Sequence, residues 1–206
     1  MTAHYRLDVD ARQVADMFGA DAGRDPWAGG YVTPGRPAPL VLRGKDGGRY
    51  LAPRIWGVPP HQSFSSGITD SGRYRPVTTV RNTQSPFWIG NLRHTEFRCL
   101  VPATAFQIWS AAADPRTGRK RPYWFYAPAQ PVMAFAGIWR DSEVASFALL
   151  TTEPNDRIAA INPAAMPVIL APEDQELWLT ADWNSAESLV RPYPASMMEC
   201  LDQGGG

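Results

Sequence analysis

The sequence predicts an α+β fold, in which many short, mostly antiparallel strands and a few short helices form one domain. Three observations support this prediction. Runs of β-branched and aromatic residues recur along the chain, each only a few residues long. The 20 prolines are spread over all 206 residues, which indicates short strands joined by rigid turns. Hydrophobic residues make up 44% of the chain, which is enough for a sizeable core.

The central stretch is Arg98–Trp109, the most apolar run without helical periodicity. Its valine, isoleucine and aromatic residues favour a half-buried strand. Pro102 has no amide donor, so the run is interpreted as two short strands or as one strand with a bulge. Such a run belongs in the core, and the segments on either side must cover it.

The first 55 residues are predicted to form four elements. They are a weak strand at Met1–Leu7, a helix at Asp8–Gly19, a loop at 21–39 and a hairpin of Leu40–Arg43 with Tyr50–Ile55. Gly19 suits the left-handed position that ends many helices. The polar segment 61–76 has no periodicity and is interpreted as a surface loop or a binding lid, followed by a β-branched run at 77–82 and a helical turn at 87–92.

After the central stretch, the basic turn 111–121 is interpreted as a solvated hairpin tip. Three strands, a capped helix, a strand and a second helix should follow, at 123–126, 132–139, 146–151, 155–161, 166–170 and 171–179. Asn155 is the expected helix cap. Residues 1–190 are predicted to form the domain, and 191–206 a tail that is flexible at its C-terminal end.

Composition limits the possible functions. Lys and Arg number 20 and Asp and Glu also 20, so a nucleic-acid partner would need locally concentrated positive charge. Two distant cysteines make no disulfide framework, and without a signal peptide they favour a cytoplasmic setting. No apolar run is long enough for a membrane span. No motif indicates a metal or an organic cofactor, and the chain is expected to be a monomer.

Several ordered motifs resemble the SOS response-associated peptidase (SRAP) family, whose members recognise abasic sites in single-stranded DNA and cross-link to them. The resemblance extends from Met1 to about Trp178, and Arg98–Ala103 is close to identical to the family's Arg-Cys-Leu-Val-Pro-Ala. The other matching segments are Met1–Tyr5, Tyr31–Gly35, Ile55–Pro59, Asn82, Phe135–Trp139, Thr151–Asn155 and Met166–Leu170. Each motif alone is weak, but their common order predicts the family's fold.

The resemblance implies that the family's chemistry has been lost here. Thr2 stands where the family has its N-terminal cysteine nucleophile, and a hydroxyl is far less nucleophilic than a thiol near neutral pH. Ile108 replaces the catalytic glutamate, and Asn162 (or Pro163, by the other count) replaces the histidine. Only Asn82 is retained. Each missing acid–base group costs about 10² to 10⁴ in rate, so family-like catalysis should be essentially absent.

The same resemblance suggests which residues would contact DNA. Arg81 is a candidate phosphate contact, whereas His4 and Gln84 replace family arginines. The remaining candidates are Trp56, Gly57, Pro59 and Thr151. Trp56 is interpreted either as a core residue or as a base-stacking platform. Asn82 is interpreted either as a turn residue that bonds its own backbone or as a site residue.

Three functions remain open from the sequence. The first is a pseudo-enzyme that still binds single-stranded DNA non-covalently. The second is residual chemistry, in which a processed Thr2 supplies an amine for a transient Schiff base with abasic DNA. The third is a module recruited for a protein or small-molecule partner, favoured if Ile108 makes the pocket more apolar. A positively charged groove would favour DNA, and an apolar or acidic one another ligand.

Overall fold

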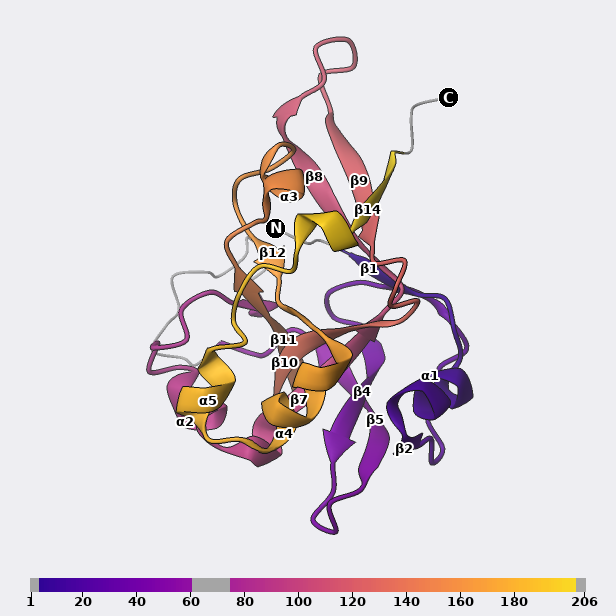
Figure 1. The fold of residues 1–206 in the computed structure, drawn as a ribbon, viewed down its shortest axis with the longest axis vertical. Coiled ribbons are helices and arrows are strands. Elements are labelled where there is room, and N and C mark those ends of the chain that lie inside the picture. Colours follow the sequence, from indigo (N-terminus) through magenta and orange to yellow (C-terminus); the bar gives the residue numbers. More distant parts are fainter. Residues whose placement is uncertain (1–3, 61–74, 203–206) are drawn as a thin grey trace.

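The structure is a computed structural model that describes residues 4–60 and 75–202, which form two β-sheets with short helices around them (Figure 1). The fold is the predicted α+β arrangement. The smaller sheet consists, in spatial order, of β14 (Glu199–Asp202), β9 (Lys120–Tyr126), β8 (Ala105–Ala113), β1 (Tyr5–Leu7) and β3 (Gly30–Val32). All its pairings are antiparallel.

Part of the larger sheet closes on itself, and the rest of the molecule is arranged around this closed part. Its strands, in spatial order, are β12 (Met166–Pro167), β11 (Ala145–Thr152), β10 (Met133–Asp141), β7 (Arg98–Ala103), β4 (Pro37–Arg43), β5 (Arg49–Trp56) and β2 (Ala20–Asp21), with β13 (Ile169–Leu170) beside β10 and β6 (Thr79–Val80) beside β11. Because β5 also pairs in parallel with β11, the path from β11 to β5 closes into a barrel.

The helices are short. They are α1 (Ala11–Phe18), α2 (Ile89–Leu92), α3 (Asp156–Ala159), α4 (Gln175–Thr180) and α5 (Trp183–Glu187), with 3₁₀ turns at Thr95–Phe97, Pro172–Asp174 and Ala195–Met197. In Figure 1, α2, α4 and α5 gather on one side of the barrel and α1 lies on the other. Among the described residues, no helix has the length and apolar character needed to cross a bilayer.

Alternation along the barrel strands divides the apolar residues into two clusters. Leu40 and Leu42 of β4 belong to one cluster, and Val41 between them belongs to the other. Cys99 and Leu100 of β7 are divided in the same way. Since successive strand residues point to opposite faces, this division means that both faces of these strands are covered. The nearly continuous apolar run in β7 therefore marks a strand buried on both sides, where the sequence predicted a half-buried strand in the core.

Local signals in the sequence mark one or both ends of two helices. Asp10 caps α1, since its carboxylate accepts from Gln13 N at 2.9 Å and the Gln13 side chain accepts in turn from Asp10 N at 3.0 Å. Gly19 ends α1 with a φ of +58°, the left-handed conformation that favours glycine. Asn155 caps α3 by accepting from Ile158 N at 3.0 Å. The positions expected for Gly19 and Asn155 are confirmed, whereas α1 begins at Ala11 and not at Asp8.

Two expectations were wrong, one on a proline-rich segment and one on long-range pairing. The predicted loop 21–39 contains β3 and the start of β4. Within β4, Pro39 lies opposite Pro53, so neither residue of this pair has to donate an amide hydrogen bond to the other. For Arg98–Trp109, the interpretation as two strands is confirmed, since β7 continues through Pro102 and the chain breaks at Thr104 before β8. The segment 193–202, assigned to the tail, packs into the fold: Tyr193 is buried and β14 pairs with β9.

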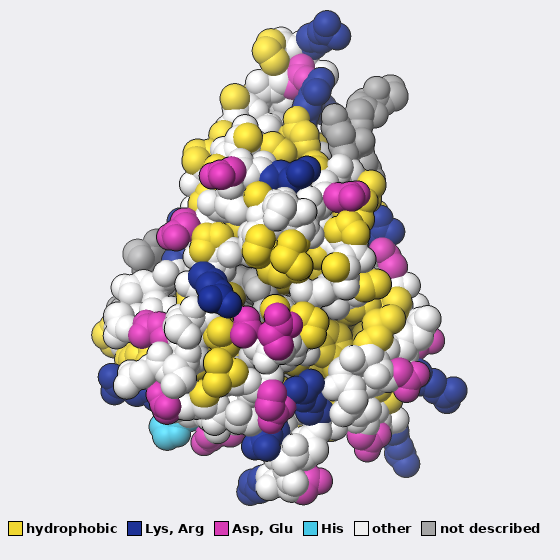
Figure 2. Space-filling view, in the orientation of Figure 1, with side chains coloured by type: hydrophobic (Ala, Val, Ile, Leu, Met, Phe, Trp, Pro, Cys, Tyr) yellow, Lys and Arg dark blue, Asp and Glu magenta, His cyan; other side chains and the backbone are white. Residues whose placement is uncertain are grey.

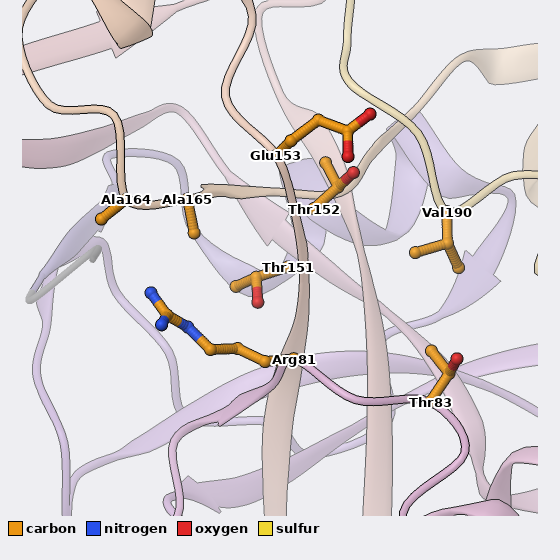
Figure 3. A pocket seen from close by; sticks show the side chains of 8 residues that line it. All are labelled: Arg81, Thr83, Thr151, Thr152, Glu153, Ala164, Ala165 and Val190. Atoms are coloured by element: carbon orange, nitrogen blue, oxygen red, sulfur yellow. The ribbon is translucent and has the colours of Figure 1, made fainter.

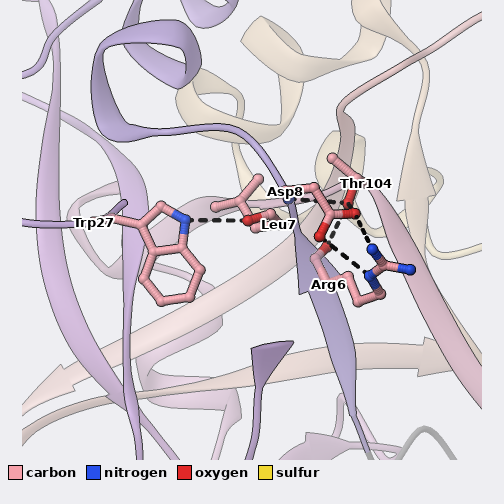
Figure 4. A network of polar contacts seen from close by, with 5 residues as sticks. All are labelled: Arg6, Leu7, Asp8, Trp27 and Thr104. Carbon is pink, nitrogen blue, oxygen red and sulfur yellow. Dashed lines mark hydrogen bonds and ion pairs between the residues drawn. The ribbon is translucent and has the colours of Figure 1, made fainter. Parts of the chain in front are cut away.

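A polar network fixes the break between β7 and β8 against the first strand (Figure 4). Thr104 Oγ1 accepts from Asp8 N at 3.2 Å and lies 3.1 Å from Arg6 O and 3.0 Å from Asp8 Oδ2. Arg6 pairs with the Asp8 carboxylate at 3.1 Å, and Trp27 Nε1 donates to Leu7 O at 3.3 Å. This network holds β1 in register with β8, and therefore sets where His4 lies.

Candidate functional site

An open pocket of about 350 Å³ lies where the ends of several elements meet. Its walls come from the segment after β6, the end of β11, the residues before β12 and the chain after α5 (Figure 3). The lining residues are Arg81, Thr83, Thr151, Thr152, Glu153, Ala164, Ala165 and Val190. Two of them, Arg81 and Thr151, were expected at the site from the sequence. We call this the Arg81 pocket.

The two charged side chains of the Arg81 pocket have no protein partner in the described part of the chain. Arg81 and Glu153 are both exposed, and neither forms a hydrogen bond or ion pair with residues 4–60 or 75–202. In Figure 3 the Arg81 guanidinium extends toward the two alanines, while Glu153 lies beyond Thr151 and Thr152. A free guanidinium in an open pocket is an arrangement that suits a phosphate group.

Two of the threonines are held by the fold. Thr151 is 6% exposed, and its hydroxyl donates to Val80 O at 3.1 Å, which ties β11 to β6. The Thr83 hydroxyl donates to Glu187 Oε1 at 2.9 Å, which ties the segment after β6 to α5. The floor of the pocket is therefore fixed by bonds between elements distant in sequence. Arg81 is carried on the segment between these two anchors.

Asn82 and Gln84 lie beside the pocket without lining it. Asn82 Oδ1 accepts from Gln84 N at 3.0 Å, so the side chain closes a turn of its own backbone. The Gln84 amide donates to Glu187 Oε1 at 2.9 Å and lines a separate pocket next to α5. Gln84 thus lies next to a carboxylate, an unfavourable neighbourhood for a phosphate.

Trp56 is part of the core. Its side chain is 0% exposed, its ring lies 5.2 Å from that of Tyr5, and its Nε1 donates to Thr78 O at 3.0 Å. No face of the indole is open to a base, so the stacking interpretation is wrong for this conformation. Gly57 has a φ of +120° and approaches Pro76 so closely that an added Cβ would lie 2.7 Å from it. Pro59 is half-buried beside this turn.

Ile108 and Asn162 have structural roles at the positions of the missing acid–base groups. Ile108 is 0% exposed in the apolar cluster between the sheets and does not line the Arg81 pocket, so the idea that it makes the pocket apolar is wrong. Asn162 Nδ2 donates to Trp109 O at 2.8 Å, and its Oδ1 accepts from Ala164 N at 3.0 Å. Both residues stabilise the fold, and neither side chain can transfer a proton at neutral pH.

The N-terminal candidates are only partly described. His4 Nδ1 lies 3.2 Å from Gln107 Oε1, and His4 O accepts from Gln107 N at 3.0 Å, so this histidine is anchored to β8. It does not line the Arg81 pocket. Thr2 lies outside the described residues, as does most of the polar segment predicted at 61–76.

The cysteines give no reactive thiol near the Arg81 pocket. Cys99 is 0% exposed, and burial raises the pKa of its thiol well above the usual range, so it stays protonated at neutral pH. Cys200 is half-buried on β14. Within residues 4–60 and 75–202, no three His, Cys, Asp or Glu side chains come together to hold a metal ion.

Sequence reasoning missed part of the pocket wall. Thr152 and Glu153 directly follow Thr151 in a segment that had been matched to the family, so the motif itself was the available signal. Ala164 and Ala165 line the pocket from the loop that precedes β12. The resemblance gives an arginine at Ala165, and a methyl group in its place leaves open space above Thr151.

Comparison with known proteins agrees with this fold. The family model of the SOS response associated peptidase (SRAP) matches residues 1–202, and the chain therefore belongs to the SRAP family. Two solved structures, from Bacteroides thetaiotaomicron and Bordetella bronchiseptica, each superpose with a TM-score of 0.74 at 21% identity; both cover 96% of this chain, and 90% and 97% of their own. A phage-related protein from Bordetella bronchiseptica has a TM-score of 0.72 at 20% identity, covering 97% of this chain and 92% of its own.

No curated protein matched the chain in the corresponding search. At these identities the structural neighbours establish the shared fold alone. Membership of the family associates the chain with the SOS response and supports, at family level, a role in binding abasic sites in damaged DNA.

Proposed function

We propose that this chain binds single-stranded DNA non-covalently at the Arg81 pocket and forms no covalent adduct. The observation that carries the proposal is the free Arg81 guanidinium, exposed in an open pocket and without a partner among the described residues. Arginine binds phosphate through several donors in a fixed geometry, and the desolvation cost is small at an exposed site. The family's association with damaged DNA gives the nucleic acid as the ligand.

The loss of chemistry follows from the residues at the family's acid–base positions. Ile108 is apolar and buried, and Asn162 is committed to two backbone hydrogen bonds. No general acid or base is therefore available from either position. The pocket holds one cation and one carboxylate, Arg81 and Glu153, so its net charge is near zero and its affinity for DNA should be modest and dependent on salt.

Replacing Arg81 with alanine tests the proposal. We expect Arg81→Ala to weaken binding of a fluorescent single-stranded oligonucleotide about tenfold, the loss of roughly 1.4 kcal/mol expected for one phosphate contact. The slope of log K against log salt should decrease by about 0.7, because one fewer counterion is released from the strand. Fluorescence anisotropy over a series of salt concentrations measures both quantities.

The matched control is Arg24→Ala, which removes an exposed arginine from the loop after β2, away from the pocket. This variant should leave the affinity within about twofold and the slope unchanged. Equal effects of the two substitutions would show that binding depends on overall charge. An unchanged affinity in Arg81→Ala would refute the assignment of the pocket.

A further inference from the structure

The hairpin of β8 and β9 projects from one end of the molecule, and its tip stands clear of both sheets (Figure 1). Its tip residues include four cations, Arg116, Arg119, Lys120 and Arg121, and a single acid, Asp114. Figure 2 shows Lys and Arg side chains at this projecting end. In a chain whose formal net charge is zero, this is a marked local concentration of positive charge. We call residues 110–121 the basic arm.

The fold uses the acid of the basic arm internally. Asp114 is 9% exposed, and its Oδ1 accepts from Arg116 N at 2.7 Å and from Thr117 N at 3.2 Å. Its Oδ2 pairs with Arg121 at 2.5 Å. These hydrogen bonds lower the pKa of Asp114, and the bond from Arg116 N has the largest effect. The carboxylate therefore stays ionised and holds the turn. One acid and one cation are thereby used to build the tip.

The other three cations face solvent. Arg116, Arg119 and Lys120 are exposed, and their side chains form no ion pair or hydrogen bond with the described residues. The turn from Asp114 to Lys120 has no large apolar side chain that could insert into a lipid surface. It also has no aromatic ring for stacking. Such a surface suits a flexible polyanion and would contact phosphates without reading sequence.

The base of the basic arm is joined to the wall of the Arg81 pocket. Ala111 N donates to Ile161 O at 2.9 Å, and Asn162 donates to Trp109 O at 2.8 Å. The same loop continues to Ala164 and Ala165, which line the pocket. Arg116 follows Trp109 by seven residues, which is at most about 23 Å along an extended strand. A single strand leaving the pocket over this loop can therefore reach the tip.

We propose that Arg116, Arg119 and Lys120 bind the phosphates of single-stranded nucleic acid that extends beyond the Arg81 pocket. The inference rests on the proposed function of that pocket and adds a second contact area to it. The arm supplies affinity for long strands, and the pocket alone holds short ones. Because the contacts are to phosphates, the arm's contribution is independent of base sequence and strongly dependent on salt.

The test combines a triple variant with two lengths of DNA. Arg116→Ala, Arg119→Ala and Lys120→Ala are introduced together, which leaves the Asp114–Arg121 pair intact. Binding is measured by anisotropy with single strands of about 6 and about 30 nucleotides, which lie near the lower end of and above the usual site sizes of about 4 to 16 nucleotides. For the long strand, the slope of log K against log salt should decrease by about 2, or 0.7 for each of three phosphate contacts. For the short strand it should not change.

The control is the triple variant Arg12→Ala, Arg24→Ala and Lys45→Ala, which removes three equally exposed cations from α1, the loop after β2 and the β4–β5 turn. This variant should bind both strands as the unaltered chain does. Circular dichroism establishes that both triple variants are folded.

Each outcome distinguishes the arm from the pocket. If the arm variant keeps the full slope on the long strand while Arg81→Ala weakens binding, the arm proposal is wrong and the proposed function stands. If both triple variants lose the same slope, the effect is overall charge and the arm is again refuted. If the unaltered chain binds neither strand, both proposals are wrong. If the arm variant loses binding to anionic phosphatidylserine vesicles while its binding to DNA is unchanged, the arm binds lipid and the arm proposal is wrong.

Discussion

Ile108→Glu, which restores the family's carboxylate, is expected to destabilise the protein by about 4 kcal/mol or more at neutral pH and to restore no cross-linking. Ile108 is 0% exposed within an apolar cluster that includes Phe106 and Phe125. Loss of a buried isoleucine alone costs about 2–5 kcal/mol, and burial of a carboxyl group without a partner adds to it. The measurement is urea unfolding followed by tryptophan fluorescence.

The effect should depend on pH with a defined sign. A carboxyl group buried at this position is expected to have its pKa raised from about 4.3 toward 8 or 9 in the folded state. The folded form therefore binds a proton more tightly than the unfolded form. Relative to the unaltered chain, Ile108→Glu should be least destabilised below about pH 4, and the difference in stability should grow by about 1.4 kcal/mol per pH unit between the two pKa values.

Ile108→Gln is the matched control, because it has a similar shape and polarity but does not titrate. Ile108→Gln should also be destabilised, but the size of its destabilisation should not grow as pH rises. A stable Ile108→Glu variant that cross-links abasic DNA would mean that position 108 faces the DNA-binding site and not the core.

Trp56→Ala is expected to lower the free energy of unfolding by about 3–5 kcal/mol, the usual cost of removing a buried tryptophan. The indole packs against Tyr5 and Phe147, at ring distances of 5.2 and 6.4 Å, and its hydrogen bond to Thr78 O links β5 to the segment before β6. Urea unfolding of the variant measures the loss, with Trp139→Ala as a half-buried control expected to lose less.

The same variant separates the two interpretations of this tryptophan. If Trp56 stacks on DNA, Trp56→Ala should keep its stability and lose affinity for single strands. If it belongs to the core, stability should fall first, and affinity measured under conditions where the variant is folded should change little. The structure supports the second result, since the side chain has no exposed surface.

Much of the fold was predictable because its signals are local. The β4–β5 hairpin is marked by four turn residues, 45–48, and the caps at Asp10, Gly19 and Asn155 act within one turn of helix. Pairings between distant segments were not predictable in this way. Strand β14 is ordinary in sequence and is stabilised by pairing with β9, more than 70 residues away, as in the pairing of Glu199 with Tyr126.

Residues of the candidate site were predictable where a motif identified their position in the sequence. They were not predictable where the answer depends on which way the side chain points. Arg81 and Thr151 lie at the pocket, as the motifs indicated. Trp56 and Ile108 are both 0% exposed in one apolar cluster, and an apolar residue in a strand does not by itself show whether its face packs on the core or borders a site. Glu153 was passed over because a single exposed carboxylate has no distinctive signal in one sequence.

The most direct test of non-covalent DNA binding uses a fluorescent single-stranded oligonucleotide with one abasic site. The complex is divided between a native gel and a denaturing gel, with and without borohydride. The account predicts a shifted band on the native gel at low salt and no retained protein on either denaturing gel. A protein–DNA band that survives denaturation would show that covalent chemistry persists. If that band appears only with borohydride, the adduct is a Schiff base. The absence of any shift on the native gel would refute DNA binding.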